Sequence, residues 1–310
     1  MGEKVLKQVF DKSDFEEFTH RVQVETALLQ EWCKEGLLAE DKNKGGFELE
    51  MWLLNDDFKP ASNNLSYIKS FNYCSLISEA SQSCIEANLW YEQLNNKTLE
   101  KHHESLANLL SHCQEHARKT NQHTIAIGTL PTATSNDFND FTITNENRYH
   151  AINNRLILLR DHLVPQLHIE GNQILDMPVN SFSLVGAISS YQIHFQIPQS
   201  KSARFYNASV ALSAPMVALS ANSPFMFGCD LWEESRIPFY ERILKTKFSN
   251  DKLARVTFGS GYVKNSLLDL FNENCTSYSP LLPQVMDVEI ETMSHLQLHN
   301  GNNIVVGKFH

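Results

Sequence analysis

The sequence predicts an α+β fold in which helices pack around a mostly antiparallel sheet. Segments with the two-residue periodicity of strands are interspersed with segments of helical periodicity, without the regular strand–helix–strand alternation of parallel-sheet proteins. Hydrophobic residues make up 42% and charged residues 20% of the 310-residue chain, which is ordinary for a globular protein with a sizeable core. We expect one domain over residues 1–310.

The first half of the chain is expected to alternate helices with strands. Ser13 and Glu16 have the spacing of a capping box and predict the start of a helix that ends near Gly36. Further elements are expected, in chain order, as a strand at 46–52, a helix at about 99–119, a strand at 124–130, a loop at 132–144 and a helix at 145–162.

The second half is expected to contain short strands and an apolar helix. The helix at 203–220 is rich in Ala and Ser, and we expect it to pack closely against a sheet. The remaining elements are expected as strands at 173–176, 180–185 and 191–197, a helix at 262–273 and a strand at Val285 to Ile290.

Two of the expected strands each have a polar face. In the strand at 46–52, period-two alternation places Glu48 and Glu50 on one face. The strand at 191–197 has a face that is polar throughout, made of Gln192, His194 and Gln196. Oxygen and imidazole ligands on rigid strands suit a hard divalent cation of the kind that carries ATP.

Each of these candidates also has an ordinary structural interpretation. Alternating acids such as Glu48 and Glu50 can protect a solvated edge strand from aggregation. A single histidine such as His194 is commonly a hydrogen-bonded core residue. The polar neighbours of His194 favour a binding site, because a simple core strand needs no polar face.

Composition argues against several classes of function. The formal charge is -10, with 36 acidic and 26 scattered basic residues, so broad nucleic-acid binding is not expected. No apolar run approaches the ~18 residues of a membrane span, so we expect no membrane association. The six cysteines lack C-x-x-C spacing, which indicates a reduced compartment and a cytoplasmic protein. A G-x-x-x-x-G-K-S/T loop is also absent, so a nucleotide would be held by a sheet surface and cations.

Six sequence blocks together resemble the glutamate-cysteine ligase family, in its bacterial carboxylate-amine ligase branch. In chain order the blocks are Gly46-Phe47-Glu48-Leu49-Glu50, Ile127-Gly128-Thr129-Leu130-Pro131-Thr132, Arg148-Tyr149, Gln192-Ile193-His194, Ala221-Asn222-Ser223-Pro224-Phe225 and Trp232-Glu233-Glu234-Ser235-Arg236-Ile237. They follow the family's order, and an ordered set is hard to obtain by chance.

The resemblance implies a glutamine-synthetase-like fold and ATP-dependent formation of an amide bond through an acyl phosphate, with Mg²⁺ or Mn²⁺ as cofactor. Its implied substrates are an amino-acid carboxylate and an amine. Glu48 and Glu50 match the family's metal-binding pair, and His194 matches the second histidine of its His-x-His strand. These three residues are therefore the predicted metal ligands.

The predicted nucleotide- and substrate-binding residues are Glu86, Asn88, Arg148, Gln192, Gln196 and Arg236. Glu86 and Asn88 share a face if residues 84–89 form a strand, and they form a surface pair if the segment is a helix. Arg148 is either a phosphate ligand or an exposed helix-terminal residue. Arg236 has a fork of donors suited to a carboxylate or phosphate, and the equal alternative is an ion pair with Glu233 or Glu234.

Two departures from the family pattern predict an alternative function. Gln192 stands where many relatives have a histidine, and relatives continue past the His299-Asn300-Gly301 region into a strand that closes the pocket. We therefore expect the chain to lack the family's C-terminal portion, and the uncovered sheet edge to favour a homodimer. The alternative to a ligase is a non-catalytic module that binds a nucleotide or an amino acid.

One short motif suggests a different chemistry. His112, Glu115 and His116 match the H-x-x-E-H pattern of inverted zinc peptidases, with both histidines on one face of a helix. The rest of that architecture is missing from the sequence, so an ordinary polar helix face is the favoured interpretation.

Overall fold

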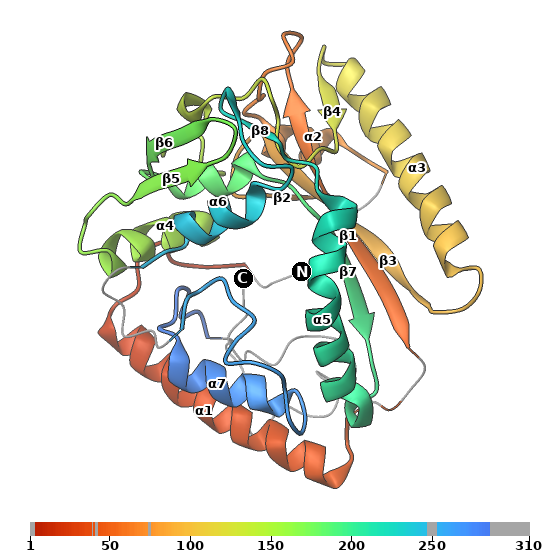
Figure 1. The fold of residues 1–310 in the computed structure, drawn as a ribbon, viewed down its shortest axis with the longest axis vertical. Coiled ribbons are helices and arrows are strands. Elements are labelled where there is room, and N and C mark those ends of the chain that lie inside the picture. Colours follow the sequence, from red (N-terminus) through yellow and green to blue (C-terminus); the bar gives the residue numbers. More distant parts are fainter. Residues whose placement is uncertain (1–3, 39, 41–42, 74–75, 247–252, 286–310) are drawn as a thin grey trace.

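The largest sheet among the described residues is antiparallel; the structure, a computed structural model, describes residues 4–38, 40, 43–73, 76–246 and 253–285 (Figure 1). The strands of this sheet are β1 (Lys44–Leu54), β2 (Leu76–Ser78), β3 (Cys84–Gln93), β4 (His123–Ile125) and β7 (Tyr191–Gln196). The strand order is β2-β3-β1-β4, and β7 also pairs with β1, alongside its N-terminal part. Every pairing is antiparallel, which confirms the predicted α+β class.

The remaining elements are helices and small hairpins. The helices are α1 (Lys12–Glu35), α2 (Asn64–Ser70), α3 (Thr98–Arg118), α4 (Asn147–Leu159), α5 (Ser202–Ser220), α6 (Arg236–Ile243) and α7 (Leu268–Ser277). The short 3₁₀ helices are η1 (Ser135–Asp137), η2 (Phe182–Ala187) and η3 (Gln199–Lys201). Two small hairpins are formed by β5 (Gln166–Glu170) with β6 (Ile174–Pro178), and by β8 (Phe225–Met226) with β9 (Cys229–Asp230).

The two faces of β1 have different surroundings. Leu49, Met51 and Leu53 pack with residues of α2 and α3, and Figure 1 shows α3 running along that side of the sheet. On the opposite face, Trp52 and Leu54 belong to a second core cluster that includes β5, β6 and α6. The acidic positions of β1 precede Trp52 on this second face, so the apolar core ends where the carboxylates begin.

The start of α1 differs from the prediction. Asp11 is the N-cap, and its carboxylate accepts a hydrogen bond from the Ser13 amide at 2.8 Å. The Asp14 side chain completes the capping box by accepting from the Asp11 amide at 2.8 Å. The predicted Ser13–Glu16 box is therefore wrong by two residues, because aspartate is at least as good a cap as serine. The helix ends, as predicted, at Gly36 in the left-handed conformation.

Two predicted elements are shorter than expected. Strand β4 ends at Ile125, and the Ile127 carbonyl instead accepts hydrogen bonds from Trp52 Nε1 at 3.0 Å and Ser189 Oγ at 2.6 Å. The helix expected at 262–273 begins only with α7, because the Asp269 carboxylate binds backbone amides of the preceding turn. The strand expected at Val285 to Ile290 lies largely outside the described residues.

Helix α5 does not pack closely against a sheet, contrary to the prediction. Of its residues only Ser202 is buried, whereas Leu212 and Leu219 keep 57% and 82% of their surface exposed. Its first half is held by a neighbouring loop, in which the Val263 carbonyl accepts a hydrogen bond from Asn207 Nδ2 at 2.8 Å.

The strand expected at 180–185 is also wrong, because most of this segment lies in the 3₁₀ helix η2. Ser181 caps it by accepting from the Ser183 amide at 3.3 Å. Gly186 lies against Ser81, and a Cβ at position 186 would sit 2.3 Å from the Ser81 Cβ. The tight approach fixes η2 against the β2–β3 turn.

Replacing Gly186 with alanine should therefore destabilise the fold. We expect a loss of ~1–3 kcal/mol in the free energy of unfolding, the usual cost of overpacking a buried contact, measured by chemical denaturation. Gly46→Ala is the matched control, because its Cβ would meet nothing closer than 3.6 Å. Equal stability of both variants would contradict this packing.

Candidate metal centre

The polar face of the sheet is assembled from β1 and β3. Their antiparallel register places Glu48 opposite Asn88 and Glu50 opposite Glu86. Directly opposed residues in antiparallel strands point to the same face, so all four side chains share one surface. The segment at 84–89 is a strand, as the binding interpretation of Glu86 and Asn88 requires.

Strand β7 and the residue before it contribute groups that hold Glu50. The Ser190 amide donates to Glu50 Oε2 at 2.6 Å, and the Glu50 amide donates to the Ser190 carbonyl at 3.0 Å. Gln192, which lies opposite Glu48, donates from Nε2 to Glu50 Oε1 at 3.4 Å. The amide of Gln192 therefore contacts a carboxylate of the site.

A third carboxylate, Glu79, joins Glu50 and Glu86. One oxygen from each of the three side chains lies within 4.8 Å of the others. Glu79 directly follows β2 and comes two residues after Ile77, which lies opposite Glu86. Side chains two residues apart in an extended strand point to the same face. The sequence prediction missed it, because a three-residue strand has too little periodicity to show which way the next side chain points.

The three carboxylates resist ionisation together. Burial, with a smaller effect from the Glu86 charge, raises the pKa of Glu50 to about 7 against the lowering effect of its bond to Ser190. Burial and the charges of Glu50 and Glu86 raise the pKa of Glu79 well above its usual value. The pKa of Glu86 is raised as well, first by burial and then by Glu48.

This donor set fits a hard divalent cation. Three carboxylates close together supply the oxygen ligands that Mg²⁺ and Mn²⁺ prefer, and a bound cation would reverse the local charge that now disfavours ionisation. Among the described residues no other set of three metal-ligating side chains lies as close together. Asn88 Nδ2 donates to Glu86 Oε1 at 2.9 Å, which orients one of the three carboxylates.

The predicted ligands Glu48, Glu50 and His194 are divided between two arrangements. Glu50 belongs to the three-carboxylate group, whereas Glu48 Oε2 lies 3.1 Å from His194 Nε2. His194 pairs with Gly46, four residues before Glu50, which is ~13 Å along the strand. The imidazole therefore contacts Glu48, and Glu48 lies between the imidazole and the three-carboxylate group along β1.

The remaining predicted residue of β7 lies farther away. Gln196 is opposite Lys44, six residues before Glu50, which corresponds to ~20 Å along β1. Its side chain is exposed. The structure therefore does not bring Gln196 to the carboxylates.

The two predicted arginines have different surroundings. Arg148, in the first turn of α4, is near enough for its charge to lower the pKa of both Glu79 and Glu86. Arg236 instead forms an ion pair with Glu234 and donates from Nη1 to the Ser189 carbonyl at 2.9 Å. The structure thus supports the ion-pair alternative for Arg236 and places Arg148 within electrostatic range of Glu79 and Glu86.

The histidines of the H-x-x-E-H motif take part in ring packing. The ring of His112 stacks on Tyr73 with a centroid distance of 3.7 Å. His116 lies edge-on to Tyr67 at 4.8 Å, with its Nε2 2.9 Å from Ser70 Oγ. These contacts support the ordinary helix-face interpretation.

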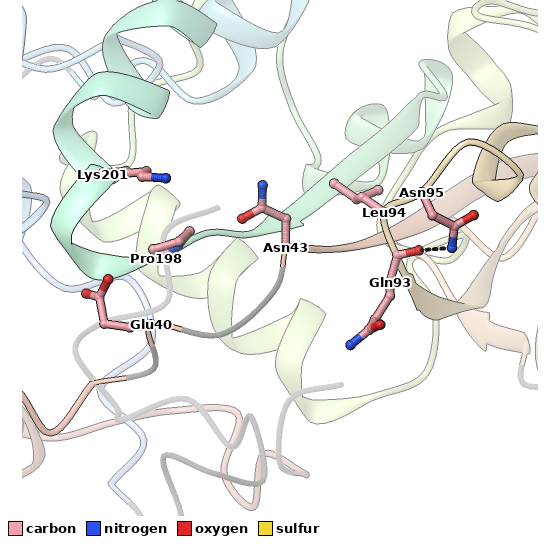
Figure 2. Close-up of a pocket in the computed structure, with 7 residues that line it drawn as sticks. All are labelled: Glu40, Asn43, Gln93, Leu94, Asn95, Pro198 and Lys201. Atoms are coloured by element: carbon pink, nitrogen blue, oxygen red, sulfur yellow. Dashed lines mark hydrogen bonds between the residues drawn. The ribbon is translucent and has the colours of Figure 1, made fainter.

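An open hollow of about 560 Å³ lies at the other end of the sheet (Figure 2). Its lining is Glu40, Asn43, Gln93, Leu94, Asn95, Pro198 and Lys201. Figure 2 shows the Lys201 side chain extending toward Asn43. Asn43 is seven residues before Glu50, or ~23 Å along an extended strand, so the hollow is separate from the carboxylates.

Comparison with known proteins gives one family match. A model of glutamate-cysteine ligase family 2 matches residues 84–253, more than half of the 310-residue chain. The matched range includes Glu86, Arg148, His194 and Arg236 and excludes Glu50. Among curated proteins nothing matches.

A solved structure with limited similarity is glutamate–cysteine ligase from Francisella tularensis, determined in complex with AMP. It is 14% identical with a TM-score of 0.33, and the alignment covers 59% of this chain. The chain spans 32% of the length of that structure. Separately, none of the helices described for this chain has the length and apolar character needed to cross a membrane.

Proposed function

We propose, because the chain belongs to glutamate-cysteine ligase family 2, that it is an ATP-dependent carboxylate–amine ligase. The observation that carries this proposal is the group of Glu50, Glu79 and Glu86 on the polar face of the sheet. A family match alone suggests a ligase. The carboxylates add a place where this chain could bind the cation that accompanies ATP.

The proposed reaction joins an amino-acid carboxylate to an amine. A carboxylate oxygen attacks the γ-phosphorus of ATP and breaks its bond to ADP, giving an acyl phosphate. The amine then attacks the acyl carbon, loses a proton and releases phosphate. When bound, the cation supplies electrostatic stabilisation of charge on the phosphate oxygens.

The residues of this chain have separate proposed tasks. Glu50, Glu79 and Glu86 hold Mg²⁺, or Mn²⁺ in its place, while Asn88 keeps Glu86 oriented. Arg148 is the cationic side chain close to these acids and is the proposed partner of an anionic substrate group. His194 is proposed to contribute indirectly, by its contact with Glu48 at the edge of the site.

Substrate-dependent release of ADP tests the proposed function. The protein is incubated with ATP, Mg²⁺ and a panel of amino acids as carboxylate and amine donors, and ADP and amide products are both quantified. We expect ADP only when both donors are present. ADP release that never depends on a donor would contradict ligase chemistry, and nucleotide binding without turnover would favour the non-catalytic module.

A further inference from the structure

Arg236 uses most of its hydrogen-bond donors in contacts within the protein. Its Nε donates to Glu234 Oε1 at 2.9 Å and its Nη2 contacts Glu234 Oε2. Nη1 donates to the Ser189 carbonyl at 2.9 Å, and Nη2 also reaches the Ser220 carbonyl at 3.4 Å. A guanidinium has five N–H donors, so most of this fork is used before any ligand arrives.

The carbonyl that Arg236 holds is next to the amide that holds Glu50. Ser189 and Ser190 share a peptide unit, in which the Ser189 carbonyl accepts from Arg236 and the Ser190 amide donates to Glu50 Oε2 at 2.6 Å. Because a peptide unit is planar, fixing its carbonyl also fixes the direction of its N–H. Arg236 therefore controls the donor that orients Glu50.

Ser189 is also anchored to the Gly128 segment, through its own backbone amide. The Ser189 amide donates to the Gly128 carbonyl at 2.9 Å, and Ser189 is buried. A Cβ at position 128 would lie 2.5 Å from the Asn222 carbonyl oxygen and 3.1 Å from Arg236 Cζ. A side chain at this position would clash with the Asn222 carbonyl and crowd the guanidinium, so glycine suits it.

Glu234 is in turn fixed by its own neighbours. Ser223 Oγ donates to Glu234 Oε1 at 2.9 Å, and the Ser235 amide donates to Ser223 Oγ at 2.8 Å. Ser223 and Ser235 are both completely buried. The ion pair with Arg236 is thus held by two buried serines that are hydrogen-bonded to each other.

We propose that Arg236 is a positioning residue, which sets the cation affinity of the three-carboxylate group by holding the Ser189–Ser190 peptide unit against Glu50. This inference rests on the proposed function of that group. Partners that orient a metal ligand typically change metal affinity 10–100-fold when they are removed. The role differs from direct binding of substrate, for which the fork has few donors left.

Arg236→Lys tests the proposal, because lysine keeps the charge and loses the fork. Mn²⁺ binding to the full chain is measured by calorimetry, and stability without cation by thermal unfolding. We expect ~10-fold weaker Mn²⁺ binding in the variant. Arg242→Lys, at an exposed position of the same helix, is the matched control and should bind as the wild type does.

A double-mutant cycle with Glu50→Gln separates positioning from general destabilisation. If Arg236 acts through Glu50, Arg236→Lys should weaken Mn²⁺ binding in the wild-type background and have little further effect in the Glu50→Gln background. Equal effects in both backgrounds would show a merely structural role and overturn the proposal. Glu234→Gln, which loosens the same guanidinium, is the second variant if Arg236→Lys does not fold.

The outcomes distinguish this inference from the proposed function beneath it. Wild-type protein that binds no Mn²⁺ would overturn the metal centre and the positioning role with it. Wild-type protein that binds Mn²⁺ while Arg236→Lys and Glu234→Gln bind equally well would overturn the positioning role alone. Weakened binding that depends on Glu50 is the supporting result.

Discussion

Replacing Glu79 with glutamine is expected to weaken Mg²⁺-dependent nucleotide binding by at least ~100-fold, because it removes one of three carboxylates proposed to hold the cation. The same change should stabilise the protein without cation. Glu79 carries a raised pKa because it is crowded by burial and by the charges of Glu50 and Glu86, and a neutral amide of nearly equal volume relieves that crowding. The two effects have opposite signs, which is the mark of a site built to bind charge.

Calorimetry with Mg²⁺ and ATP measures the first effect, and thermal unfolding in the presence of a chelator measures the second. Glu100→Gln is the control, since Glu100 is an exposed acid on α3. A Glu79→Gln protein that binds the nucleotide with wild-type affinity would remove Glu79 from the metal centre. Glu48 and His194 would then be the next ligands to test.

Much of the fold could be predicted because it depends on local periodicity. The alternation of Glu48 and Glu50 with apolar residues identified β1, and the alternation around His194 identified β7. The predictions that failed depend on contacts between distant segments. Residues 180–185 were expected to be a strand, yet most of them lie in the 3₁₀ helix η2, where Gly186 approaches Ser81 closely.

The site was harder to predict than the strands that carry it. Sequence periodicity shows which residues share a face of one strand, whereas the register between strands decides which of them meet. Glu50 meets Glu86 because of that register, and His194 is placed opposite Gly46 for the same reason. Glu79 enters the group from the end of a short strand, where no periodic pattern exists.

Stability of the cation-free protein is expected to fall as the pH rises through the range set by Glu50. The pKa of Glu50 is about 7 in the folded protein, against 4.5 for an unperturbed glutamate. Between these values the folded state retains a proton that the unfolded chain has lost, so the free energy of unfolding decreases with pH. At ~1.4 kcal/mol per pKa unit, Glu50 accounts for a loss on the order of 3 kcal/mol. Glu79 and Glu86 have raised pKa values and contribute with the same sign.

Denaturant unfolding from pH 5.0 to pH 8.5 with a chelator measures this dependence, and the comparison with Glu50→Gln isolates its source. Glu25, whose pKa burial also raises to about 7, destabilises both proteins alike, so its contribution cancels in the difference. As the pH rises, we expect the free energy of unfolding of the variant to fall less than that of the wild type, because its amide at position 50 does not ionise. Saturating Mg²⁺ should stabilise the wild type more than the variant and so reduce the difference in their free energies of unfolding, since the cation stabilises the ionised carboxylates of the folded state. Parallel pH profiles for the two proteins would show that Glu50 ionises in the folded state as easily as in the unfolded chain. The interpretation that burial and neighbouring acids disfavour its ionisation would then be wrong.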